Sequence, residues 1–127
     1  MRFGKHYTRE DVRALLPQVR EWLHDLGHSR RELENCDRKL AALVEPGRDL
    51  GGDLVNRWVR VLADIKDLLF EFYHREIQIK DLDRGLLDFP AIHQGKEVFL
   101  CWEECEDDVE FWHDLDAGYA GREPIEE

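Results

Sequence analysis

Apolar residues recur at alternating spacings of three and four through the first third of the chain. They are Val12, Leu15, Val19, Trp22, Leu26, Leu33, Cys36, Leu40 and Leu43, and only Ser29 interrupts the series. A heptad pattern sustained this long predicts an amphipathic helix with a coiled-coil seam over residues 8–45. Thr8 and Asp11 have the spacing of a helix cap, and Pro17 removes one backbone hydrogen bond, so we expect a bend near it.

The same spacing returns after a break rich in Gly and Pro at residues 46–52. It predicts a second helix over residues 53–76, with apolar positions Val55, Trp58, Leu62, Ile65, Leu69 and Phe72. Two such helices joined by a short loop form an antiparallel hairpin. The first helix is the longer one, so part of its apolar seam has no partner within the hairpin.

From residue 77 the period changes from helical to alternating, which predicts a small antiparallel sheet of three to four strands over residues 77–116. Asp83, Arg84 and Gly85 form its first hairpin loop, and residues 97–102 form its most apolar strand. That strand is apolar on both faces, so both must be covered, and a partner subunit is the expected cover for one of them. Residues 117–127 are predicted to be an irregular acidic tail. The fold class is therefore α+β, in a single domain.

The net charge of −11 in 127 residues is concentrated at the C-terminal end. Residues 103–127 contain 11 acidic side chains and a single basic one, Arg122. An acidic balance is opposite to what phosphate contacts need, so no nucleic-acid partner is expected. No apolar run is long enough to span a membrane, and no signal peptide precedes the first helix. Three cysteines in such a chain favour free thiols and a cytoplasmic location.

The second half also contains a histidine among several aspartates. A histidine with two or three carboxylates suits a divalent transition metal, or a general base with its orienting partner. The candidate metal ligands are His113, Asp116, Asp81 and Asp83, and Asp88 and Asp114 belong to the same constellation.

The structural alternative is that Asp83 serves the turn, that Asp114 and Asp116 cap local backbone, and that Arg84 pairs with one of them. Cys101 and Cys105 lack the spacing of a zinc pair, so Cys101 is expected to be a small buried apolar residue.

Three runs of sequence carry a family resemblance: residues 80–91, 97–102 and 112–118. Together with Tyr7-Thr8 and Leu15-Leu16-Pro17, they resemble a short prokaryotic family known as domain of unknown function 2203. The resemblance covers nearly the whole chain and implies no activity. The chain departs from the family pattern at residues 103–110, which are more acidic.

The sequence favours a non-enzymatic cytosolic scaffold that acts through protein–protein contacts and forms a homodimer, because its apolar surface exceeds what one small domain buries easily. The alternative is a divalent-metal-binding protein or metal-dependent enzyme that uses the His/Asp cluster.

Overall fold

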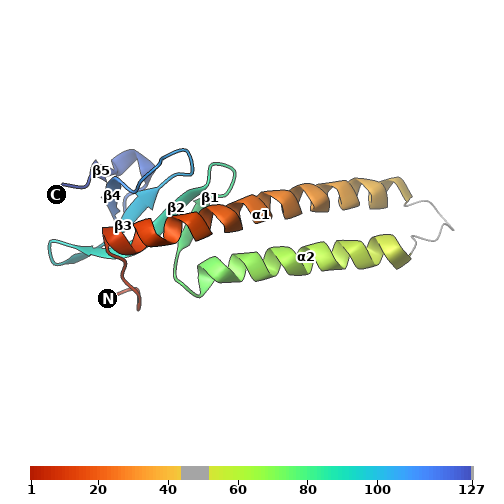
Figure 1. Cartoon of the computed structure of the whole chain (residues 1–127), viewed down its shortest axis with the longest axis horizontal. Coiled ribbons are helices and arrows are strands. Elements are labelled where there is room, and N and C mark those ends of the chain that lie inside the picture. Colours follow the sequence, from red (N-terminus) through yellow and green to blue (C-terminus); the bar gives the residue numbers. More distant parts are fainter. Residues whose placement is uncertain (44–51, 127) are drawn as a thin grey trace. The chain divides into compact units, whose positions relative to one another are not determined.

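A computed structural model describes residues 1–43 and 52–126, and it contains two helices followed by a five-stranded antiparallel sheet (Figure 1). The helices are α1 (Arg9–Leu43) and α2 (Gly52–Tyr73). The strands are β1 (Gln78–Asp81), β2 (Leu86–His93), β3 (Lys96–Trp102), β4 (Phe111–Asp114) and β5 (Glu123–Pro124). This is the expected α+β arrangement, and the Gly-rich connection between the helices lies outside the described residues.

The chain divides into two compact units. One is the helical unit Trp22–Phe70; the other combines Met1–Glu21 with Glu71–Glu127 and contains the whole sheet. No helix in the described part of the chain is long and apolar enough to cross a membrane.

The start of α1 has the cap that the sequence predicts. The backbone N–H of Asp11 donates to the Thr8 hydroxyl, and the backbone N–H of Thr8 donates to the Asp11 carboxylate, both over 3.0 Å. This reciprocal pair satisfies backbone donors that the first turn of a helix leaves open. The helix then continues through Pro17 to Leu43.

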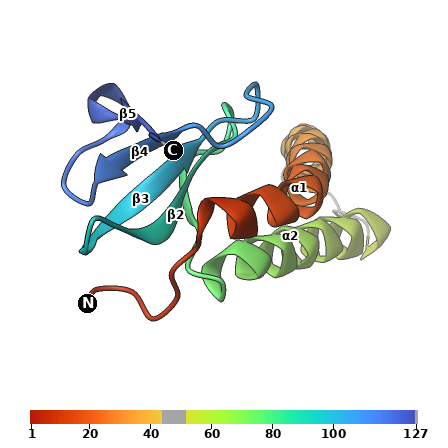
Figure 2. The same cartoon turned by 60° about the vertical axis from the view of Figure 1, so that its left-hand side comes forward.

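In the helical unit α1 and α2 lie side by side and run in opposite directions (Figures 1 and 2). Leu26 and Cys36 of α1 and Val61 of α2 are buried, and the Trp58 indole N–H of α2 donates to Asp37 of α1 over 3.0 Å. The predicted hairpin is therefore present.

The sheet is a simple meander whose neighbours follow chain order. Gly85, with φ +64°, occupies the left-handed position predicted for the first hairpin loop. The sheet has one strand more than the three to four expected. Residues 117–127, predicted to be irregular, contain a 3₁₀ turn (Tyr119–Gly121) and β5, which pairs with β4. A two-residue strand is too short to produce a periodic pattern.

Both faces of β3 are covered within the chain itself. One face carries Leu100 and Trp102 and continues through Phe89 of β2, whose ring meets the Tyr7 ring edge-on at 5.5 Å. The Arg20 guanidinium of α1 lies 4.9 Å from the centre of the Trp102 ring. On the other face, the ring of Phe3 packs on Phe99 at 5.4 Å. The expectation that a partner subunit must cover this strand is therefore wrong: residues outside the sheet fold back over both faces.

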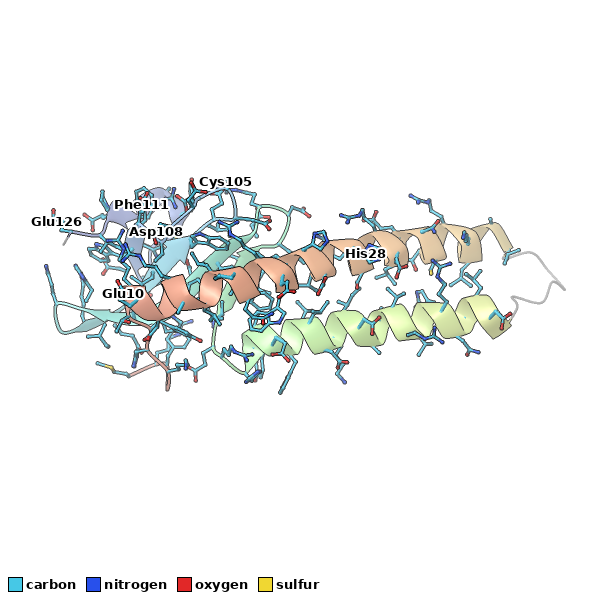
Figure 3. The ribbon with its side chains drawn as sticks, in the orientation of Figure 1. Glu10, His28, Cys105, Asp108, Phe111 and Glu126 are labelled. Carbon is cyan, nitrogen blue, oxygen red and sulfur yellow. The ribbon has the colours of Figure 1, made fainter. Side chains whose placement is uncertain are left out.

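The acidic connection after β3 is held by arginines. Arg13 pairs with Glu10 of its own helix and with Asp108, with nitrogen–oxygen distances of 2.6 Å and 2.8 Å. Glu10 and Asp108 are labelled in Figure 3. Hydrogen bonding from Arg13 lowers the pKa of Asp108. Further along α1, the Arg20 guanidinium donates to the backbone carbonyls of Glu104 and Glu106, both over 2.8 Å.

Two more carboxylates of this connection have arginine partners from the sheet unit. Nη2 of Arg84 donates to the two carboxylate oxygens of Glu103 over 3.0 Å and 2.9 Å, and Nη2 of Arg122 lies 3.0 Å from a carboxylate oxygen of Glu106. Three of the six acidic side chains in residues 103–110 therefore bind this connection to α1, to the β1–β2 turn and to the C-terminal segment.

We expect Phe89→Ala to lower the free energy of unfolding by about 3–5 kcal/mol, because Phe89 is completely buried against Tyr7. Ile92→Ala, at an exposed position of the same strand, is the control and should change it by less than about 0.5 kcal/mol. Urea denaturation followed by tryptophan fluorescence measures both. Equal losses for the two variants would contradict the assignment of Phe89 to the core.

Candidate functional site

Three neighbouring strands bring three polar side chains together on one face of the sheet. Asp88 of β2 is paired in register with Cys101 of β3, and His113 of β4 is paired with Phe99, two residues before Cys101. Side chains two positions apart on a strand point to the same face. All three side chains are 1–2% exposed, and one donor atom from each lies within 4.8 Å of the others.

The hydrogen bonds of His113 fix where its protons lie. Its Nδ1 is 2.8 Å from the backbone carbonyl oxygen of Asp114, and its Nε2 is 3.0 Å from Oδ1 of Asp88. A carbonyl oxygen only accepts, so Nδ1 carries a hydrogen and donates it. The contact between Nε2 and the Asp88 oxygen then needs a proton of its own, which the two side chains share.

Burial sets the acidity of the other two groups. Desolvation raises the pKa of Asp88, although the nearby His113, a hydrogen bond from Cys101 and the charge of Lys80 oppose the rise. Desolvation and the neighbouring Asp88 charge also raise the pKa of the Cys101 thiol to about 12, against a hydrogen bond from Arg122. Cys101 is therefore a neutral thiol at physiological pH.

A pocket of about 180 Å³ opens directly beside the three side chains. Its apolar wall includes Phe99 and Leu115, and its polar lining includes Lys80 and Tyr119. The Lys80 ammonium lies 5.5 Å from the centre of the Phe99 ring.

The C-terminal segment forms the outer wall of the pocket. Residues 115 and 117–119 line it. The Tyr119 ring has the guanidinium groups of Arg84 and Arg122 at 4.5 Å and 4.1 Å from its centre. Cation–π contacts of this kind, together with the Arg122–Glu106 ion pair, hold the segment over the sheet.

The structure brings one of the four predicted metal ligands into this group. His113 is at its centre, whereas Asp81 accepts a hydrogen bond from the backbone N–H of Arg84 over 3.2 Å in the turn after β1. Asp83 is exposed in the same turn, and Asp116 lines a second, open hollow on the surface together with Asp114 and Lys96.

The structural alternative expected Arg84 to pair with one of these aspartates. Arg84 pairs with Glu103 instead. Asp114 is paired with Lys96 over 2.7 Å.

Cys101 is the member of the group that sequence reasoning missed as a candidate ligand. Its neighbours in sequence are apolar, and a single cysteine without a second at metal-ligand spacing gives no sequence signal. The relevant information is the register between two strands: the pairing of residues 87–90 with 99–102 places Cys101 opposite Asp88.

The fold and the site together define a class of protein. It is an α+β protein in which an Asp, a Cys and a His side chain from three neighbouring strands are buried together beside a small pocket. The chain belongs to the family described as Uncharacterized conserved protein (DUF2203), whose model matches residues 5–125. No curated protein and no solved structure matches the chain. The three runs that carry the resemblance, residues 80–91, 97–102 and 112–118, each supply one member of the buried group.

We expect Asp88→Asn to stabilise the protein relative to wild type increasingly as the pH rises from about 4 towards neutral. The raised pKa of Asp88 means that its contribution to stability is full below its unfolded value of 3.8 and is lost as the pH rises through the folded value. The amide of the variant can still donate to Nε2 of His113 without a buried charge. Urea denaturation across this pH range measures the difference.

Asp108→Asn is expected to change the free energy of unfolding in the opposite direction. The pKa of Asp108 is lowered, so its stabilisation is present above 3.8 and is lost as the pH falls. This variant should be less stable than wild type at neutral pH and approach it in acid. If both variants followed the same pH trend, the buried, desolvated state of Asp88 would be contradicted.

Proposed function

We propose that this protein binds a divalent transition metal through a carboxylate oxygen of Asp88, Sγ of Cys101 and Nε2 of His113. The observation that carries the proposal is the meeting of oxygen, sulfur and nitrogen donors within 4.8 Å of one another in a buried position. These three donor types together are the set that Zn²⁺ accepts most readily, so zinc is the first ion to test.

The orientation of His113 supports a role as ligand. Its Nδ1 hydrogen is held by the Asp114 carbonyl, which directs the Nε2 lone pair towards Asp88 and Cys101. Metal-bound histidines are typically fixed in this way by a second hydrogen bond to a carbonyl or carboxylate. Around a tetrahedral zinc, donor atoms lie roughly 3.3–3.8 Å apart for bonds of about 2.0–2.3 Å, so small side-chain rotations complete the geometry.

Three protein ligands leave one coordination position open, and the 180 Å³ pocket beside the group provides the space for it. A site of this type binds an exchangeable water or small ligand, in contrast to a structural zinc site with four protein ligands. Lys80 on the pocket lining supplies a positive charge next to that position. We therefore propose an accessible metal centre, which is the alternative that the sequence analysis held, with Asp88 and Cys101 in place of Asp81, Asp83 and Asp116.

Metal binding at this site must displace protons. Cys101 is a thiol with a pKa of about 12, and Asp88 and His113 hold a proton between them. A cytosolic location, as expected from the free cysteines, would keep the Cys101 thiol reduced and able to bind. The protein-interaction module that the sequence favoured rests on the unpaired seam of the first helix and on the doubly apolar strand, and it is independent of this proposal.

We expect the untagged protein to bind about one Zn²⁺ or Co²⁺ per chain, with the thiolate-to-cobalt absorption band that a sulfur ligand produces. Cys101→Ser should remove that band and weaken binding by at least about tenfold, because a serine oxygen is a poorer ligand for these ions. Cys105→Ser, at an exposed cysteine four residues away, is the matched control and should bind as wild type does. Wild-type protein that takes up far less than one metal per chain, or a Cys101→Ser variant with unchanged spectrum, would refute the site.

We also expect each bound metal to release about two protons near neutral pH, one from Cys101 and one from the Asp88–His113 pair. The apparent affinity should accordingly rise as the pH increases. Calorimetry in buffers of different ionisation enthalpy measures the number of protons released. Asp88→Asn should release fewer protons and bind more weakly, and release unchanged by this substitution would place the metal elsewhere.

A further inference from the structure

The helical unit exposes a set of large apolar side chains on one side of α2. They are Val59, Leu62, Leu69 and Phe70, which are 53%, 37%, 39% and 57% exposed. Their spacings of three, seven and eight residues along the helix place them within a single stripe, which we call the outer face of α2. Lys66 lies within this stripe, between Leu62 and Leu69.

A helix that packs on only one neighbour normally buries its apolar side and exposes polar residues. Helix α2 already buries Val61 and half-buries Ile65 and Leu68 within the hairpin. The outer face is therefore apolar surface beyond what the hairpin uses, and exposed apolar side chains gathered in one stripe are typical of an interface.

We propose that the outer face of α2 packs against the same face of a second copy of this chain, with the two α2 helices antiparallel. The partner is identified by the charges beside the stripe. Arg60 and Asp67 are exposed, seven residues apart, and so lie on the same side of the helix about 10.5 Å from each other. Within the described residues neither has an ion-pair partner.

A two-fold axis near Ala63 and Asp64 brings Arg60 of each copy opposite Asp67 of the other. An antiparallel pair thus forms the same ion pair twice, whereas a parallel pair would put the Arg60 and Asp67 side chains of the two copies on opposite sides of the interface, where they do not meet. A closed two-fold interface requires one surface to be complementary to itself. The outer face meets this requirement, because its apolar stripe packs on the same stripe and Arg60 of one copy meets Asp67 of the other.

The apolar side chains and the charges have different roles in this interface. Exposed ion pairs contribute little to affinity, so the strength must come from Val59, Leu62, Leu69 and Phe70. The charges favour the antiparallel orientation because only that orientation brings Arg60 of one copy next to Asp67 of the other. The aliphatic stem of Lys66 can cover apolar surface while its ammonium group reaches solvent.

Sedimentation velocity on the full chain, from about 1 to 100 μM, tests the proposal. We expect a dimer for wild type and a monomer for Leu62→Glu, with a dissociation constant raised by about 100-fold or more, since the substitution places a charge in the buried stripe. Ile92→Glu is the control: Ile92 is 43% exposed in the sheet unit, so this variant should dimerise as wild type does. A wild-type monomer across this range, or a dimer unaffected by Leu62→Glu, would overturn the proposal, including the case in which the face serves a different protein.

Charge variants test the partner and the orientation without disturbing the apolar stripe. Arg60→Glu and Asp67→Lys should each weaken self-association by about tenfold, because each replaces two attractive pairs by two repulsive ones. An equimolar mixture of the two variants should recover the wild-type affinity as a heterodimer, and the double variant R60E/D67K should recover it alone. Single variants that associate as tightly as wild type would contradict the antiparallel pairing.

Discussion

The structure of the sheet unit depends on the need to cover both faces of β3. All five residues from Val98 to Trp102 are buried, although a strand in a small antiparallel sheet usually has one wet face. On one face Tyr7 and the first part of α1 supply the cover, and on the other the N-terminal residue Phe3 and the C-terminal segment supply it. The face covered by Phe3 and the C-terminal segment is the one that carries Asp88, Cys101 and His113. The pocket exists because the C-terminal segment spans this face without filling it completely.

The buried polar group has a cost that apolar packing in its place would avoid. Removing a carboxylate from water is unfavourable, and the raised pKa of Asp88 expresses that penalty. Within the described residues every buried side-chain nitrogen and oxygen has a hydrogen-bond partner. These hydrogen bonds reduce the free-energy penalty of burying Asp88 but do not remove it. A buried carboxylate with a raised pKa beside a pocket is the kind of group that candidate functional sites contain.

Some of the acidic residues at the C-terminal end have a structural role that the net charge does not reveal. Glu103, Glu106 and Asp108 pair with Arg84, Arg122 and Arg13, which come from three separate segments of the chain. Each carboxylate binds a different segment to the same connection between β3 and β4. These three carboxylates therefore hold segments of the sheet unit together. The proposed metal centre lies in this unit and the proposed dimer interface lies in the helical unit, so either can fail without affecting the other.

Local pattern in the sequence determined the two helices, the Thr8–Asp11 cap, the Gly85 turn and four of the five strands, because each depends on neighbours within a few residues. It also identified His113 and the acidic residues around it as the place to look for chemistry. Tertiary structure alone decided which of those residues meet. Asp88 and His113 are 25 residues apart and face each other only because β2, β3 and β4 pair in one register. A shift of one residue in that register would turn Cys101 to the opposite face, and periodicity along a strand does not encode the register of its neighbour.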